Sequence, residues 1–155
     1  MLDDFRPIMP SLIRLIAGII VLFTVQTVIL GFPGIAQPVL NSTITTAALA
    51  LFTIGIVAAV VVVKFGTQLS NSVAEGYRAY KAYVPLLTYF FQIAALWILY
   101  TASKGITSGV FNSVPWAYPT IFLVLALIPT VRVVVNIVHA LEGHTAEHPL
   151  IREQV

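Results

Sequence analysis

Four long, sparsely charged apolar runs constrain the fold of this chain more than any other feature. They cover residues 12–31, 43–63, 84–103 and 119–139. Each run reaches the roughly 18 to 20 residues that a helix needs to cross a bilayer core about 30 Å thick. Because 59% of the 155 residues are hydrophobic and only 9% are charged, a soluble globular domain is excluded. The sequence therefore predicts a single all-α domain with four transmembrane helices.

The charged residues predict how the chain is oriented in the membrane. All six acidic residues fall on one side, together with the basic residues Arg6, Arg14, Lys64, Arg78, Lys81, Arg132 and Arg152. Only Lys104 falls on the opposite side. By the positive-inside rule, both termini and the segment 64–83 are cytoplasmic, and the two other connections face outward. We expect this orientation in the plasma membrane.

The composition and the absence of known catalytic patterns remove several classes of function. The chain has no cysteine, which excludes disulfides, thiolate metal sites and covalent c-type haem. A formal net charge of +2 is too small to indicate nucleic-acid binding. There is no serine, histidine and aspartate set, phosphate-binding loop or intramembrane carboxylate pair, so neither an enzyme nor a proton-driven transporter is indicated. We expect no cofactor, and the lipid bilayer is the first partner.

Segment 64–83 is the only long run in which polar and charged residues outnumber large aliphatic ones. At helical spacing it predicts a cytoplasmic amphipathic extension of the second transmembrane helix, with a polar face of Lys64, Gln68, Asn71, Glu75 and Arg78. The opposite, apolar face consists of Phe65, Leu69, Val73, Tyr77, Tyr80 and Val84. This helix either lies on the membrane surface, with its tyrosines beside Arg78 and Lys81, or meets neighbouring subunits. A partly helical, solvated connection is the third alternative.

Polar and small residues inside the first three runs indicate contacts between helices. Gln26 and Gln92 lie deep in their runs, where an amide needs a hydrogen-bonding partner on another helix. Gly55 and Ala59 have the spacing that lets two helix backbones approach closely. These residues predict packing partners, either within the chain or in a second subunit.

The fourth run contains the most informative polar pattern. Arg132, Asn136 and His139 follow one another at spacings of four and three, so they share one helical face, and Pro129 precedes them. One interpretation is an anchored helix end, whose arginine reaches the headgroups by snorkelling. The other is a pore-lining face, where Arg132 favours anions or gating and His139 confers pH dependence between about pH 5 and 7.

Three short patterns in the connections and the tail carry weaker predictions. Asn41 begins a glycosylation acceptor pattern, but its place beside the second run favours a helix cap. Gly105 and Gly109 favour a flexible outer connection, with a re-entrant segment at 105–114 as the alternative. In the predicted cytoplasmic tail, residues 140–155, His144 and His148 match an inverted zinc-protease pattern. No third ligand is evident, so these histidines are weak metal candidates.

The segment LIRLIAGIIVLF followed by GFPGI resembles the first helix and loop of the DoxX-like family of small four-helix membrane proteins. The resemblance implies four transmembrane helices, in agreement with the apolar runs. It also leads us to expect an acidic residue in the second run, and this sequence has none there.

Three hypotheses for the function remain. The first is a homo-oligomeric, channel-like membrane protein that forms a pore for ions or small solutes. It needs several copies, because four helices of this length enclose no substantial cavity. The second is a non-conducting scaffold or accessory subunit of a larger membrane complex. The third and most distant is a small membrane-bound metalloenzyme that uses the tail histidines.

Overall fold

The computed structural model describes residues 8–39 and 43–145, apart from the side chains of residues 78–80, 141 and 143–145. Within these residues the α-helices are α1 (Met9–Leu30), α2 (Thr46–Gly76), α3 (Val84–Val110) and α4 (Ala117–Thr145). A short 3₁₀ helix, η2 (Arg78–Tyr83), connects α2 to α3, and the described residues form no β-strand. All four α-helices are long and apolar enough to cross a membrane, which confirms the prediction of an all-helical chain with four candidate spans.

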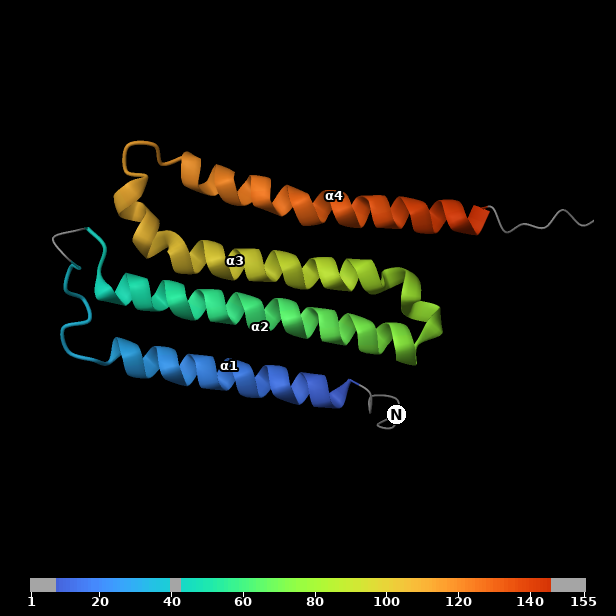
Figure 1. The fold of residues 1–155 in the computed structure, drawn as a ribbon, viewed down its shortest axis with the longest axis horizontal. Coiled ribbons are helices and arrows are strands. Elements are labelled where there is room, and N and C mark those ends of the chain that lie inside the picture. Colours follow the sequence, from blue (N-terminus) through green and yellow to red (C-terminus); the bar gives the residue numbers. More distant parts are fainter. Residues whose placement is uncertain (1–7, 40–42, 146–155) are drawn as a thin grey trace, which may run out of the picture.

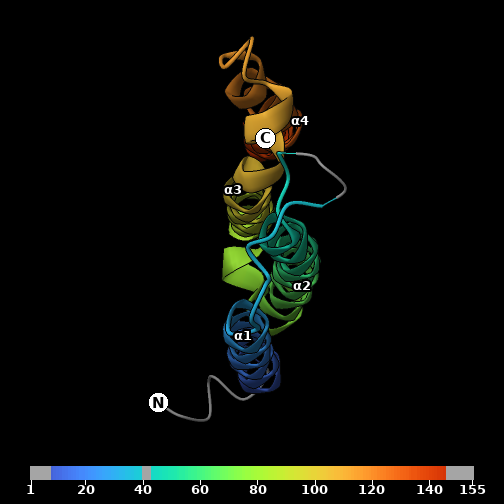
Figure 2. The same cartoon turned by 90° about the vertical axis from the view of Figure 1, so that its left-hand side faces the viewer.

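The four helices lie side by side in chain order (Figure 1). Figure 2 shows that they form a single layer. α2 packs most extensively on α3, while α1 packs on α2 and α4 packs on α3. The start of α1, η2 and the end of α4 lie at one end of this row, which we call the η2 end, and the other connections lie at the loop end. The row is open, so α1 and α4 are its edges and both broad faces are accessible.

Small residues bring α2 and α3 close together. A Cβ atom added to Gly55 would overlap the Cβ of Ala102, so only glycine fits at this point of the contact. Toward the η2 end, the side chain of Phe91 fills the space beside Gly66 in the same way. Lipid offers no hydrophobic driving force for the association of helices. Helix pairs in membranes therefore depend on the tight packing that close backbone approach allows.

Capping and proline residues explain why the helices begin close to the predicted positions. Thr45 caps α2, since its hydroxyl accepts a hydrogen bond from the backbone N–H of Ala48 at 3.2 Å. Pro10 and Pro85 lie in the first turns of α1 and α3, where a missing N–H costs nothing.

The third helix is longer than the third apolar run. α3 continues to Val110, so residues 104–110, which the sequence analysis places in an outer connection, form its last turns. The prediction of a flexible connection at Gly105 and Gly109 is therefore wrong, while the re-entrant alternative stays a prediction. A Cβ added to Gly105 would lie 2.9 Å from the Cβ of Ala48, so this part of α3 is packed closely on α2. That contact stabilises the helix despite the low helix propensity of glycine.

The central segment is helical in two parts. α2 continues through Lys64 without a break and ends at Gly76. Tyr77 has a non-helical backbone (φ −133°, ψ 84°) and separates α2 from η2. The hydropathy of the sequence changes at Lys64, but the helix does not, because backbone hydrogen bonding is indifferent to side-chain charge.

α3 of the same chain covers part of the apolar stripe predicted in this segment. Phe65 is 5% exposed, and its ring centroid lies 5.3 Å from that of Phe91, in an edge-to-face arrangement. Ser70 is 2% exposed and accepts a hydrogen bond of 2.8 Å from the hydroxyl of Thr88. The stripe therefore needs less cover from a membrane surface or a second subunit than the sequence alone indicates.

Candidate functional site

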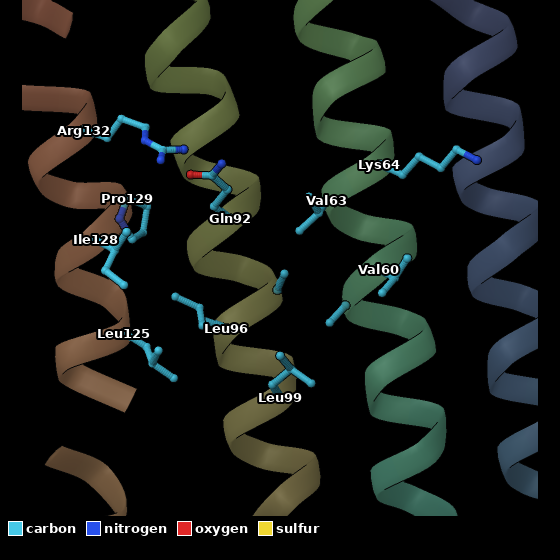
Figure 3. A pocket seen from close by; sticks show the side chains of 12 residues that line it. Val60, Val63, Lys64, Gln92, Leu96, Leu99, Leu125, Ile128, Pro129 and Arg132 are labelled. Atoms are coloured by element: carbon cyan, nitrogen blue, oxygen red, sulfur yellow. The ribbon is translucent and has the colours of Figure 1, made fainter. Parts of the chain in front are cut away.

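A groove of about 530 Å³ lies on one broad face of the row, with α3 as its floor and α2 and α4 as its walls (Figure 3). Most of its lining is aliphatic and comes from Ala59, Val60, Val63, Ala95, Leu96, Leu99, Leu125, Ile128 and Pro129. Three polar residues complete the lining, namely Lys64, Gln92 and Arg132. We call this hollow the apolar groove.

A smaller hollow of about 170 Å³ lies between α3 and α4 and adjoins the groove. The two share Gln92, Pro129 and Arg132. The smaller one is further lined by Val84, Pro85, Thr88, Tyr89, Val133 and Asn136, so it lies toward the η2 end. We call it the polar pocket. Of the predicted pore residues, it brings together Gln92, Arg132 and Asn136.

Arg132 extends sideways from α4 toward α3, and the amide oxygen of Gln92 is turned toward it (Figure 3). The side chain does not run along α4 toward the η2 end, as snorkelling in that direction requires. Lys64 lines the groove with its stem, while its ammonium group points toward α1. Arg132 is therefore the cation that lies over the junction of groove and pocket.

Several other polar groups around the pocket are already bonded. The hydroxyl of Thr88 donates to Oγ of Ser70, and the hydroxyl of Thr130 donates to the carbonyl of Ala126 at 2.7 Å. The Tyr89 hydroxyl lies 3.1 Å from Oγ1 of Thr130 and so donates to it, which links α3 to α4. These bonds satisfy the donors and hold the two helices in register.

Gln92, Arg132 and Asn136 differ from these residues, because their side chains make no hydrogen bond or ion pair within the described part of the chain. A guanidinium presents a planar set of N–H donors that matches carboxylates and phosphates, and each amide adds two donors. Neither hollow is lined by an aspartate or a glutamate. The site is thus suited to bind an anionic group.

Gln26 lies in a different place, on the other side of the α2–α3 contact. It lines a hollow of about 340 Å³ with residues of α2 and α3, among them Thr101. On α3 this hollow uses residues 98, 101, 102 and 105, whereas the groove uses 92, 95, 96 and 99. At about 100° per residue these are separate faces of the helix. Gln26 and Gln92 are therefore not brought together.

The remaining candidates lie apart from the polar pocket. His139 is exposed, and its Nδ1–H donates to the carbonyl of Val135 at 2.9 Å, within its own helix. Gly55 and Ala59 are buried at the contact with α3. In the central segment, Leu69, Val73 and Tyr77 are half-buried and Lys81 is exposed.

Several predicted residues fall outside the description. The side chains of Arg78, Tyr80 and His144 are among those not described, and His148 and Asn41 lie outside the described residues. Within the described ranges, no group of three histidine, cysteine or acidic residues is placed to hold a metal ion.

Two features of this region were not predicted from the sequence. Lys64, predicted on the polar face of the connection, lines the groove across from Gln92 of the third run. An aromatic cluster lies at the loop end, where the rings of Tyr100 and Tyr118 stack with centroids 4.9 Å apart. The hydroxyl of Tyr118 bonds to Ser103 at 2.8 Å and to the carbonyl of Tyr100. Pairing of α3 with α4 was needed to find it.

Comparisons with models of protein families, with curated proteins and with solved structures find no match for this chain. The resemblance of its first helix and loop to the DoxX-like family is thus not accompanied by a family match. The chain's function is therefore to be inferred from the geometry of its residues.

Proposed function

We propose that this protein is a non-conducting scaffold or accessory subunit of a membrane complex, which works by holding a further transmembrane helix against its row of helices. The partner is in the first place a second copy of the same chain, so the working unit is a homo-oligomer. The hollow beside Gln26 carries this proposal.

This hollow combines the two features that helix contacts in membranes use. Its walls contain small residues. Ala48 and Gly55 are already buried in the α2–α3 contact, whereas Ala58, Ala102 and Gly105 keep exposed surface that a partner helix can approach closely. Gln26 supplies an amide that makes no hydrogen bond within the described part of the chain. An amide surrounded by hydrocarbon gains roughly 1 kcal/mol from a partner on another helix.

The open row supports the same proposal. No residue of α1 is buried, because α1 packs on α2 alone among its main contacts. Apolar exposure by itself demands no partner in lipid, since acyl chains solvate it. The unpaired amide next to small residues does favour one. A helix seated there would also cover the inner side of α1.

The lining of the groove favours a scaffold over a conducting pore. A pore needs polar groups or backbone carbonyls along its length to replace the hydration of an ion. The groove is aliphatic from Leu99 and Leu125 up to the level of Gln92. The groove therefore has polar groups that could replace the hydration of an ion only near the η2 end.

Replacing Gln26 with leucine tests the scaffold. Gln26→Leu removes the amide and keeps a similar volume, so we expect self-association in reconstituted bilayers to weaken about fivefold. Energy transfer between donor- and acceptor-labelled copies, measured over a range of protein-to-lipid ratios, reports this change. Gln92→Leu, on the other side of the α2–α3 contact, is the matched control and should leave association unchanged. A wild-type chain that stays monomeric at every ratio contradicts the proposal.

A channel is the second candidate, because Gln92, Arg132 and Asn136 line one pocket and are free of internal partners within the described residues. In an oligomer whose copies turn this face inward, the guanidinium would form a cationic ring that favours anions.

Current recordings from reconstituted protein test the channel. If this face lines a pore, Arg132→Glu should move the reversal potential from anion toward cation selectivity, because it replaces a cationic ring with an acidic one. Lys104→Glu, a charge reversal at the loop end, is the control for surface charge. The scaffold proposal expects no steady current from the wild-type protein.

A further inference from the structure

The apolar groove and the polar pocket form one continuous, amphiphilic hollow, and we infer that it binds an acidic glycerophospholipid. An acyl chain lies along α3 between α2 and α4, and the phosphate lies at Arg132. This inference is independent of the proposed scaffold function, which uses the hollow beside Gln26 on the other side of the α2–α3 contact.

Two helices change from aliphatic to polar at the same level of the hollow. Along α3, Leu99 and Leu96 are followed by Gln92 toward the η2 end. Along α4, Leu125 and Ile128 are followed by Arg132, and then by Asn136 in the pocket. The two patterns run in opposite directions along the chain, so their agreement results from the antiparallel packing. A ligand that fits has an apolar tail and a polar head at the η2 end.

The head must carry negative charge. Arg132 lies over the junction of groove and pocket, and no acidic residue lines either hollow. A guanidinium that is neither paired nor hydrated is costly at membrane depth. A lipid phosphate offers two oxygens to the guanidinium fork, and the amide of Asn136 supplies further donors.

The alternatives to an acidic phospholipid each leave part of the hollow unused. An uncharged lipid fills the groove but leaves Arg132 unpaired. A free phosphate pairs with Arg132 but leaves about 530 Å³ of aliphatic groove empty. The predicted orientation agrees, because the η2 end faces the cytoplasmic leaflet, whose acidic lipids attract basic residues.

Native mass spectrometry of the full chain in mild detergent tests this inference. We expect palmitoyl-oleoyl-phosphatidylglycerol to bind at least about tenfold more tightly than the phosphatidylcholine with the same acyl chains. Both lipids carry a phosphate, but phosphatidylcholine adds a quaternary ammonium group that is repelled by Arg132, whereas phosphatidylglycerol keeps a net negative charge. Arg132→Gln should abolish this preference. Lys104→Gln makes the same change of charge at the loop end and should retain it.

A second pair of variants tests the groove without altering charge. Ile128 lines the groove and is 59% exposed, while its neighbour Leu127 is 52% exposed and does not line it. Ile128→Trp should therefore lower the affinity for phosphatidylglycerol about tenfold by filling the groove, and Leu127→Trp should leave it unchanged. The comparison of these two variants tests lipid binding in the groove even if Arg132→Gln does not fold.

Three results would overturn the inference. The first is equal retention of the two lipids by the wild-type protein. The second is displacement of phosphatidylglycerol by inorganic phosphate at equal concentration, which assigns the site to a free anion. The third is equal behaviour of Ile128→Trp and Leu127→Trp, because binding would then not involve the groove.

Discussion

Gly55→Ala is expected to destabilise the protein by about 1–3 kcal/mol, the usual cost of overpacking a well-packed contact. The added methyl group overlaps the Cβ of Ala102, so α2 and α3 must separate along their most extensive contact. The obstacle is a Cβ atom next to the backbone, which cannot rotate away as the end of a long side chain can. Unfolding in detergent, followed by helical circular dichroism against denaturant, measures the loss.

Two further variants show that the effect comes from this contact. Ala102→Gly removes the opposing methyl group, so the double variant should recover much of the stability that Gly55→Ala loses. Gly18→Ala is the matched control, because its Cβ would lie 3.7 Å from Val61, an ordinary packing distance. Two results would show that the helices are not packed in this way. One is an unchanged stability of Gly55→Ala, and the other is a double variant that loses more stability than the two single variants together.

Labelling of single cysteines in intact cells should give an all-or-none result that reports the orientation. The chain has no cysteine of its own, so each variant carries one reactive site. Asn112 is exposed at the loop end, and Ala82 is exposed in η2. Because the positive-inside rule places the loop end outside, a membrane-impermeant maleimide should label Asn112→Cys and leave Ala82→Cys unlabelled.

Permeabilised cells supply the control for this experiment. Once the membrane is opened, Ala82→Cys should react as readily as Asn112→Cys, which shows that its thiol is accessible. Pro33→Cys, at the exposed start of the other loop-end connection, should behave like Asn112→Cys. Labelling of Ala82→Cys in intact cells would reverse the predicted orientation, and with it the assignment of the lipid site to the cytoplasmic leaflet.

Part of the candidate site follows from the sequence, because it depends on the spacing within one helix. Arg132 and Asn136 are four residues apart, so a single turn places them on one face. The need of Gln92 for a partner also follows from its depth in an apolar run. The sequence did not indicate that Lys64 and Gln92 line the same groove, since the two belong to different helices and their relative level depends on how α2 and α3 pack.

The amino-acid sequence by itself indicated four helices long and apolar enough to cross a membrane, because backbone groups in lipid must be bonded within each segment and apolar length is a local property. Only the tertiary structure decided that these helices form an open row, with Gln26 and Gln92 on different sides of the α2–α3 contact. That arrangement results from close fits such as Gly55 on Ala102, between residues far apart in the chain. Hydropathy and spacing describe one helix at a time, so they contain no information about which small residues meet.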